Sequence, residues 1–411
     1  MQIRDFQLER YFALHEFTAR YLLSASDCEA LSLADLLDLA DDEMAALWRG
    51  LKLSYTESQG NTLLRAEIAA LYEGVTADDV LIAAPEELIF IAMHALLAPG
   101  DQVITLAPAY QSLHEVARAL GCTVTPWSLT HDGAGWRLDL AALERLLTPR
   151  ARLLVINFPH NPTGFLPTRA ELQAILRFAI RHSLFVFSDE MYRLLEYDAS
   201  DRLPSVASLY ERSLALSGLS KSFALPGLRI GWLVGRDRTL LRRCIAFHDY
   251  TTICNSAPAE SLGIVALRAA EHILARNLEI IRGNLAVAQR FFIAHRDLFT
   301  WLPPAAGSVA FPQLRPDRPV ADFGRELLAQ KSVMIVPGAM FGHAGNHFRI
   351  GLGRVNFPAA LGQVEDHLAN PVGGGLAPED GNTSGWRVDY TAVSSVTVGA
   401  GRGAVLLNNW P

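Results

Sequence analysis

Cysteine is scarce in this chain, with four residues among 411, at Cys28, Cys122, Cys244 and Cys254. No two of them form a CxxC pair or have the spacing of zinc ligands, and the 12 histidines form no HExxH motif. We therefore expect neither a disulfide framework nor a bound metal. A chain that lacks such a framework is typical of reducing compartments, so the composition favours a cytoplasmic location.

Long hydrophobic runs and a surplus of basic charge are also absent. The first residues, MQIRDFQLERYF, carry charges throughout, and no apolar run reaches the roughly 18 residues that a transmembrane helix needs. The 36 Lys and Arg residues face 43 Asp and Glu residues, for a formal net charge of −7. Because partners such as nucleic acids and anionic membranes require clustered basic residues, we expect no nucleic acid and no membrane partner.

What the chain does have is an alternation of helical and strand patterns from about residue 60 onward. Three strands are continuous apolar runs, at 103–106, 153–156 and 184–187. Continuous runs indicate burial on both faces, which is typical of a mostly parallel sheet covered by helices. The sequence therefore predicts an α/β fold. We expect helices over 62–72, 85–98, 109–120, 138–147 and 168–182, and strands over 80–82, 101–106, 123–127, 153–157, 184–188, 213–217 and 230–234.

The pattern changes after residue 255, where a long helical stretch (258–294) is followed by short strands at 309–311, 333–336 and 347–350. We expect a smaller α+β domain built from both chain ends. The last 41 residues hold 8 of the 30 glycines and lack a helical period, which predicts a poorly ordered tail. The expected domains are a large cofactor-binding domain at 45–255, a small domain at 1–44 with 256–370, and the tail at 371–411.

Polar residues follow three of the predicted strands, and the carboxyl ends of parallel strands form the ligand-binding edge of an open α/β sheet. The strand ending at 157 is followed by FPHNPTG, the next by Asp189-Glu190-Met191-Tyr192, and the third by Gly218-Leu219-Ser220-Lys221. Singly, each loop has a structural explanation as a turn, a helix cap or a solvated lysine. Together they place an amide, a carboxylate with a phenol, and a lysine at one edge.

This set suits the chemistry of pyridoxal 5′-phosphate (PLP). A lysine amine forms an imine with the cofactor aldehyde. A carboxylate keeps the pyridine nitrogen protonated, so that the ring can accept the electrons of a carbanion. Amide and phenol groups hold the ring oxygen, and an arginine with a helix N-terminus holds the phosphate.

From about Leu53 to Leu368 the sequence resembles the class I/II aminotransferases, which are fold type I PLP-dependent enzymes. The segment LSASDCE at 23–29 is similar to a subgroup that includes the capreomycidine synthase-like enzymes. The motifs that carry the main resemblance are YTESQGNTLLRAEIA (55–69), PAY (108–110), NFPHNPTG (157–164), DEMY (189–192), SGLSKSFALPGLRIGW (217–232), PGAMFG (337–342) and FRIGLG (348–353).

The resemblance implies a functional role for each matching residue. Each residue could instead have a purely structural role, in core packing, in a turn or as a surface charge. The resemblance implies that Lys221 is the Schiff-base lysine and the proton carrier, and that Tyr55 reaches the phosphate of a neighbouring subunit, so that a homodimer shares its active sites. The other implied roles are Asp189 at the pyridine nitrogen, Tyr192 and Asn161 at the ring oxygen, Tyr110 stacked on the ring, Arg229 at the phosphate, and Arg349, with Asn161, at the substrate carboxylate.

Two departures from the family pattern concern the phosphate. The expected phosphate-binding helix starts with Ala84, Pro85, Glu86 and Glu87; proline lacks an N–H donor, and we expect the glutamate side chains to point away. Gly218 stands where many members carry a phosphate-binding serine, so Ser217 or Ser220 is expected to substitute.

The resemblance therefore implies a homodimeric, cytoplasmic, PLP-dependent aminotransferase that acts on an α-amino acid and a 2-oxo acid. The alternatives are PLP-dependent elimination, oxidation or cyclisation on the same scaffold, as in the capreomycidine synthase-like enzymes, and a non-catalytic regulator of the same fold. Such regulators normally carry a DNA-binding helix-turn-helix, which the sequence does not show. No second arginine for a dicarboxylate is identifiable, so the sequence does not name the substrate side chain.

Overall fold

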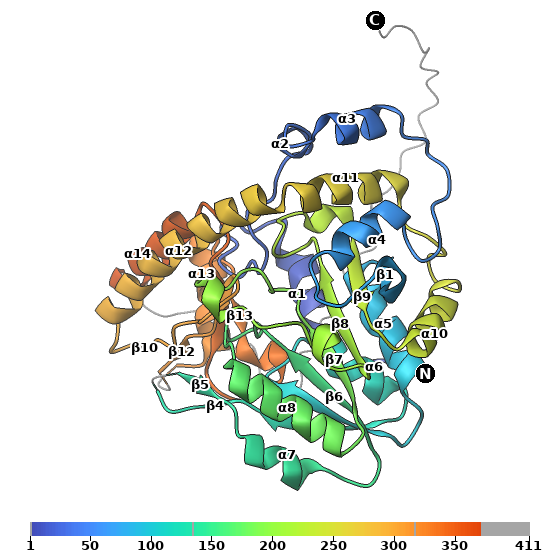
Figure 1. Ribbon diagram of the computed structural model, residues 1–411. Helices are drawn as coiled ribbons and strands as arrows, with labels where there is room; N and C mark the ends of the chain where they lie inside the picture. The colour runs from blue at the N-terminus through green and yellow to red at the C-terminus, as the bar shows by residue number, and fades with distance from the viewer. Residues whose placement is uncertain (1, 134, 316–317, 371–411) are drawn as a thin grey trace, which may run out of the picture. The chain divides into compact units, whose positions relative to one another are not determined.

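The computed structural model describes residues 2–133, 135–315 and 318–370, and the residues up to 370 form one compact unit (Figure 1). The predicted tail at 371–411 lies outside the described residues. The division of the rest into a large and a small domain stays a prediction.

A seven-stranded sheet of order β1-β9-β8-β7-β6-β2-β3 forms the centre of the fold. Strands β3, β2, β6, β7 and β8 are parallel, and β9 runs antiparallel to both β8 and β1. The sheet is therefore mostly parallel, as predicted. Its strands are β1 (Val80–Ala83), β2 (Gln102–Ala107), β3 (Thr123–Ser128), β6 (Ala151–Asn157), β7 (Phe185–Asp189), β8 (Ser213–Gly218) and β9 (Gly231–Val234).

Alternate residues of each strand enter two different hydrophobic cores, one on each face of the sheet. On β6, Leu153 and Val155 pack in the core that contains Leu88 of the helix after β1, while Leu154 and Ile156 pack in the other core. Because both faces are buried, nearly every position of these strands is apolar. This is why the sequence shows continuous runs rather than alternation.

Helices cover the sheet and complete the fold. They are α1 (Gln7–His15), α2 (Leu33–Leu37), α3 (Asp42–Arg49), α4 (Thr62–Ala69), α5 (Pro85–Leu96), α6 (Ser112–Ala119), α7 (Leu140–Leu146), α8 (Arg169–Arg181), α9 (Val206–Leu209), α10 (Arg238–His248), α11 (Ala257–Arg268), α12 (Ala270–Ala294), α13 (Val320–Lys331) and α14 (Phe357–Ala369), with short 3₁₀ turns η1 (Ala77–Asp79), η2 (Ala199–Asp201), η3 (Pro226–Leu228) and η4 (Gly338–Phe341).

The five helices predicted before residue 255 correspond to α4, α5, α6, α7 and α8. The long helical stretch expected over 258–294 consists of two helices, because Ala269, whose ψ is 14°, ends α11 before α12 begins. One predicted element is wrong in detail. The strand expected over 333–336 starts only at Val336; Val333 makes an isolated bridge to Tyr21 instead. The short strands are β4 (Thr130–His131), β5 (Trp136–Arg137), β10 (Phe299–Thr300), β11 (Val309–Ala310), β12 (Gln313–Leu314), β13 (Val336–Pro337) and β14 (Phe348–Gly351).

The N-terminal segment 23–28 lies directly against β14, and two glycines make the contact possible. A Cβ on Gly351 would lie 1.5 Å from the carbonyl oxygen of Ala25, and one on Gly353 would lie 2.5 Å from that of Asp27. The Gly351 N–H donates to the Leu23 carbonyl over 2.7 Å. The N-terminal residues thus pack with the C-terminal part of the chain, as expected.

A similar close approach explains Gly218 at the end of β8. Gly218 is paired with Gly231 of β9, and a Cβ on Gly218 would lie 3.0 Å from the Gly231 Cα atom. Any side chain at 218 would have to push the two strands apart. The missing serine is therefore a consequence of strand packing.

The four cysteines carry free thiols. Among the described residues, no helix combines the length and the apolar character needed to cross a membrane. No cluster of His, Cys, Asp or Glu in that part of the chain could hold a metal ion.

Candidate active site

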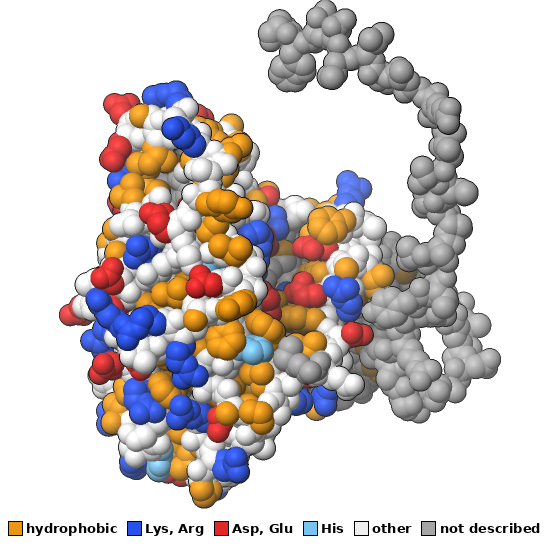
Figure 2. Space-filling model, turned by 90° about the vertical axis from the view of Figure 1, so that its right-hand side faces the viewer, with side chains coloured by type: hydrophobic (Ala, Val, Ile, Leu, Met, Phe, Trp, Pro, Cys, Tyr) orange, Lys and Arg blue, Asp and Glu red, His pale blue; other side chains and the backbone are white. Residues whose placement is uncertain are grey.

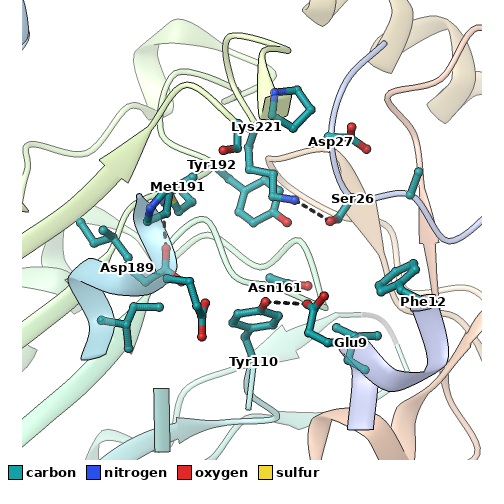
Figure 3. Close-up of a pocket in the computed structure, with 18 of the residues that line it drawn as sticks. Glu9, Phe12, Ser26, Asp27, Tyr110, Asn161, Asp189, Met191, Tyr192 and Lys221 are labelled. Atoms are coloured by element: carbon teal, nitrogen blue, oxygen red, sulfur yellow. Dashed lines mark hydrogen bonds between the residues drawn. The ribbon is translucent and has the colours of Figure 1, made fainter. Parts of the chain in front are cut away.

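A cavity of about 520 Å³ is lined by residues at the carboxyl ends of three neighbouring strands. Asn161 comes from the loop after β6, Asp189 is the last residue of β7, and Lys221 lies in the turn after β8. Figure 3 shows the three side chains around one space. The cavity has the volume of a typical small-ligand site. The structure thus brings together the three loops that the sequence singled out.

Asp189 is fixed at this edge by a network that joins β6 to β7. Asn157 donates from Nδ2 to the Asp189 carbonyl over 2.8 Å and accepts the Asn161 N–H at Oδ1 over 2.7 Å. The Asp189 carboxylate accepts the Met191 N–H over 3.1 Å. Burial raises the pKa of Asp189 to about 7. A cationic group placed against this carboxylate would favour its ionised form.

Lys221 lies across the cavity from Asp189. Its Nζ donates a hydrogen bond of 2.8 Å to Ser26 Oγ (Figure 3). Burial lowers the pKa of the Lys221 ammonium below its ordinary value, and the nearby Asp27 carboxylate opposes that effect. A lower pKa favours the uncharged amine, which is the form that acts as a nucleophile or a base.

Arg349, the second residue of β14, is 1% exposed and lines the same cavity. One terminal nitrogen donates to Asn161 Oδ1 over 3.2 Å and the other to the Ser24 carbonyl over 3.1 Å. Its Nε–H has no partner among the described residues. A buried guanidinium with a free donor in a cavity is suited to a carboxylate ligand.

Two tyrosines also line the cavity. Tyr192 is 2% exposed, and burial raises the pKa of its phenol well above the ordinary value. Tyr110 follows β2, donates from its hydroxyl to Glu9 Oε1 over 2.8 Å and packs against the Phe6 ring at 5.0 Å. The Tyr110 ring is therefore held in place by Glu9 and Phe6, whereas the Tyr192 hydroxyl has no hydrogen-bond partner among the described residues.

A set of phosphate-binding candidates lies at the start of α5 and in the loop after β8. Pro85, Glu86, Ser220 and Arg229 line the cavity. The Ser220 hydroxyl is buried without a hydrogen-bond partner among the described residues. Arg229 has a left-handed backbone with φ of 55°, a strained conformation that recurs at functional sites.

The expectation for Glu86 is wrong, and the one for Glu87 is right. Glu87 points away and accepts hydrogen bonds from Thr251 and Thr252. Glu86 instead lines the cavity, and burial raises its pKa to about 7. A protonated Glu86 carries no charge, so it can lie in a cavity that also accommodates an anion.

Three of the expected site residues do not line the cavity of this chain. Ala84 caps α5 from just outside the lining. Ser217 donates its hydroxyl to the Glu190 carbonyl over 3.3 Å, which leaves Ser220 as the serine that faces the cavity. Tyr55 is 90% exposed at the surface.

Other lining residues were missed by the sequence reasoning. Glu9, Phe12 and Glu16 come from α1 and its C-terminal cap, and Ser26 and Asp27 come from the segment that packs on β14. Glu9, Phe12 and Glu16 are three and four residues apart, so their side chains lie on the same face of the helix. Nothing in the sequence indicates that this face of α1 lines the cavity.

Comparisons with known proteins agree with this arrangement. The family model "Aminotransferase class I and II" matches residues 22–365. Capreomycidine synthase of Streptomyces vinaceus is 31% identical over 320 residues, which cover 77% of this chain and 81% of that protein. Arginine–pyruvate transaminase of Pseudomonas aeruginosa is 29% identical over 346 residues, which cover 80% of this chain and 85% of that one. The crystal structure of a PLP-dependent aminotransferase from Streptococcus suis superposes with a TM-score of 0.84 at 28% identity, over 90% of this chain and 99% of its own.

The cavity also suits PLP on its own chemistry. It offers a half-buried amine for the aldehyde, a buried carboxylate for the pyridine nitrogen, and an unpartnered hydroxyl beside an arginine for the phosphate. The family match covers most of the chain. The chain therefore belongs to the class I and II aminotransferase family and is a PLP-dependent aminotransferase.

Proposed function

We propose that this cavity is where an amino group moves between an α-amino acid and a 2-oxo acid, with Lys221, Asp189 and Arg349 in the central roles. The observation that supports these roles most is that a half-buried amine, a buried carboxylate with a pKa of about 7 and a buried guanidinium line one cavity. Each of these groups is costly to bury alone, and each finds its complement in a cofactor–substrate pair.

The chain would hold the cofactor through groups at both ends of the cavity. Asp189 would hold the pyridine nitrogen, and Asn161 and Tyr192 the ring oxygen. Ser220, Arg229 and the N–H groups at the start of α5 would hold the phosphate. When bound, PLP supplies a ring that accepts electrons from the substrate Cα.

The substrate would be held and deprotonated by two residues. Arg349 binds the α-carboxylate through its free Nε–H and a second N–H, because the guanidinium fork matches two carboxylate oxygens. Lys221 Nζ takes the proton from the substrate Cα and returns a proton later in the reaction. Burial lowers the pKa of this amine, which favours the uncharged form that the first step requires.

A second candidate function is a cyclisation or elimination on the same residues. The similarity to capreomycidine synthase favours it. The two candidates differ in what leaves the site: transamination releases a 2-oxo acid and requires an acceptor, whereas cyclisation or elimination requires none.

We also propose a homodimer with shared sites. Tyr55 is exposed beside Leu53, and Tyr250 and Ile253 are exposed after α10. The two segments lie side by side, because Thr56 and Ser58 donate to Asn255 and Asp249. Hydrophobic side chains gather on this face of the molecule (Figure 2). An exposed apolar patch of this kind suits a protein interface, and Tyr55 would then reach the partner's cofactor.

A cytoplasmic location completes the proposal. It is supported by the four free thiols, two of which, Cys28 and Cys244, are fully buried.

An amino-donor screen tests the function. Purified holoenzyme is incubated with each of the 20 amino acids and pyruvate or 2-oxoglutarate, and all products are identified by mass spectrometry. Transamination predicts an acceptor-dependent 2-oxo acid together with the aminated acceptor. A cyclised or eliminated product that forms without an acceptor would assign the second function instead.

A further inference from the structure

α1 and the segment after it bring acidic groups into the cavity that the proposed function leaves unused. Besides Asp189 of β7, the lining contains Glu9, Glu16 and Asp27 from these two parts of the chain. Only three cations line it, and two of them, Arg229 and Arg349, are assigned to the phosphate and the α-carboxylate. Once those anions are bound, the remaining charge of the cavity wall is negative.

Two of these carboxylates have no cationic partner. Asp27 is held by Arg354, whose terminal nitrogen lies 3.0 Å and 2.8 Å from the two carboxylate oxygens. Glu9 accepts a hydrogen bond from the Tyr110 hydroxyl only, and Glu16 accepts none from any described residue. Neither lies within 4.0 Å of a Lys, Arg or His nitrogen in the described part of the chain.

The two free carboxylates lie on the same side of α1, one helical turn to either side of Phe12. Residues three and four apart are neighbours on a helix surface, so Glu9, Phe12 and Glu16 form one face. All three line the cavity, and Figure 3 shows Glu9 and Phe12 projecting from α1 toward it. An aromatic face between two carboxylates is suited to an organic cation.

Arg349 is the group in the cavity that can bind the carboxylate of an amino acid. Arg349 is almost completely buried, and its Nε–H is unpartnered among the described residues. Its guanidinium carbon lies 5.9 Å from the centre of the Phe12 ring. The carboxylate-binding group and the acidic face of α1 are therefore within the span of one amino acid with a long side chain.

We propose that the preferred amino donor has a cationic side chain, a guanidinium or an ammonium group, which Glu9 and Glu16 bind beside Phe12 while Arg349 holds its α-carboxylate. This inference rests on the proposed function of the cavity. Burial raises the pKa of Glu16 and the neighbouring Asp27 and Glu9 carboxylates raise it further, while the charges of Arg354 and Lys221 oppose this effect. A cation at this place would relieve that repulsion.

The test compares substrates of nearly equal shape that differ in charge. Arginine is set against citrulline, and lysine against norleucine, as amino donors of the holoenzyme. We expect the kcat/KM of the cationic member to exceed that of its neutral partner by about tenfold to a hundredfold, the size of one charge-assisted contact. Comparing the two pairs tells whether a guanidinium or an ammonium is preferred.

Variants connect the preference to α1. Glu16→Gln breaks no hydrogen bond to a described residue, because Glu16 accepts none. Glu9→Gln keeps a side-chain oxygen that can accept the hydrogen bond from the Tyr110 hydroxyl. Both variants should therefore fold. Each should reduce the arginine-to-citrulline ratio, and the double variant should bring it close to one. Glu73→Gln removes the same charge from an exposed position outside the cavity and should leave the ratio unchanged.

A binding measurement separates this inference from the proposed function. Calorimetry of the holoenzyme with 5-guanidinopentanoate and with hexanoate needs no turnover, because neither ligand has an α-amino group. If the guanidino acid binds more tightly than hexanoate and this difference disappears in the double variant, the proposal is supported. A failure to transaminate any donor would contradict the proposed function but not this preference for a cation. Equal binding of the two acids, or citrulline turned over as well as arginine, overturns the proposal and leaves the transaminase assignment intact.

Discussion

Lys221 Nζ donates its hydrogen bond to Ser26 Oγ over 2.8 Å, across 195 positions of sequence. The amine of the loop after β8 is thus oriented by the N-terminal segment that packs on β14.

Lys221→Ala should abolish both activity and covalent attachment of the cofactor. General acid–base groups contribute about 10²- to 10⁴-fold to a rate, so we expect a kcat reduction of at least that size. Borohydride treatment of the wild-type protein should leave a pyridoxyl mass on the peptide that contains Lys221. A pyridoxyl group on another lysine would show that the assignment is wrong.

Asp189→Ala should slow the reaction by several orders of magnitude while cofactor attachment continues. The carboxylate holds the charge that favours a protonated pyridine nitrogen, and only carbanion formation depends on that proton. Single-turnover absorbance measurements with one amino acid would follow this step. A loss of less than tenfold, about 1.4 kcal/mol, would place the partner of the nitrogen elsewhere.

Ser220→Ala should weaken PLP binding more than Ser217→Ala. Of these two serines, Ser220 lines the cavity and its hydroxyl has no partner among the described residues, whereas Ser217 already donates to a backbone carbonyl. A hydrogen bond to a charged group contributes about 1.5–3 kcal/mol, so the Kd of PLP should rise by at least about tenfold. The Kd is measured by fluorescence quenching of apoenzyme. Equal effects of the two substitutions would contradict this assignment.

Glu86→Gln should stabilise the apoenzyme against urea more at pH 8 than at pH 5. Burial raises the pKa of Glu86 from 4.5 to about 7, so the folded protein keeps the carboxyl protonated over a range in which the unfolded chain ionises. Wild-type stability therefore falls as the pH rises through this range, and the amide removes that loss. The free energy of unfolding should differ between the two proteins by about 2–3 kcal/mol more at pH 8 than at pH 5. Glu73→Gln serves as the exposed control, and a difference independent of pH would contradict the buried ionisation.

Tyr55→Ala and Lys221→Ala should complement each other in a mixed dimer. If Tyr55 serves the partner's cofactor, one site of the mixed dimer carries both substitutions and the other carries neither. Co-expressed, differently tagged chains purified as the mixed species should then recover part of the wild-type rate. If Tyr55 serves its own chain, each site retains one substitution and no activity returns. A monomer in light scattering would remove the basis for a shared site.

The strand-end residues could be predicted because a parallel sheet converts sequence order into proximity. The apolar runs locate β6, β7 and β8, and whatever follows them must meet at one edge, which is how Asp189 and Lys221 were placed. The prediction for Glu86 was wrong because it assumed a charged carboxylate, which a bound anion would repel from the cavity. The sequence does not show that burial raises the pKa of this carboxyl group and so favours its uncharged form. The break at Ala269 has no glycine or proline to mark it, so the helical pattern continues across it.

The contribution of α1 could not be predicted for a different reason. The helix precedes residues 22–365, which the family model matches. Its place over the cavity depends on contacts with distant residues, such as the Gln7 N–H with Gln111 Oε1 over 3.0 Å and the Tyr11 hydroxyl with the Ile335 carbonyl over 3.1 Å. No local pattern in the sequence encodes such contacts.

The contact between segment 23–28 and the glycines of β14 has a practical consequence for altering the enzyme. In that wall of the cavity the main chain of 23–28 packs directly on the main chain of 351–353. A side chain at Gly351 or Gly353 would therefore displace both Arg349 and Ser26, the residue to which Lys221 donates its hydrogen bond. The wall formed by α1 contributes Glu9, Phe12 and Glu16 to the cavity. Libraries intended to change the accepted amino acid should therefore randomise positions 9, 12 and 16 and keep 23–28 and 348–353 constant.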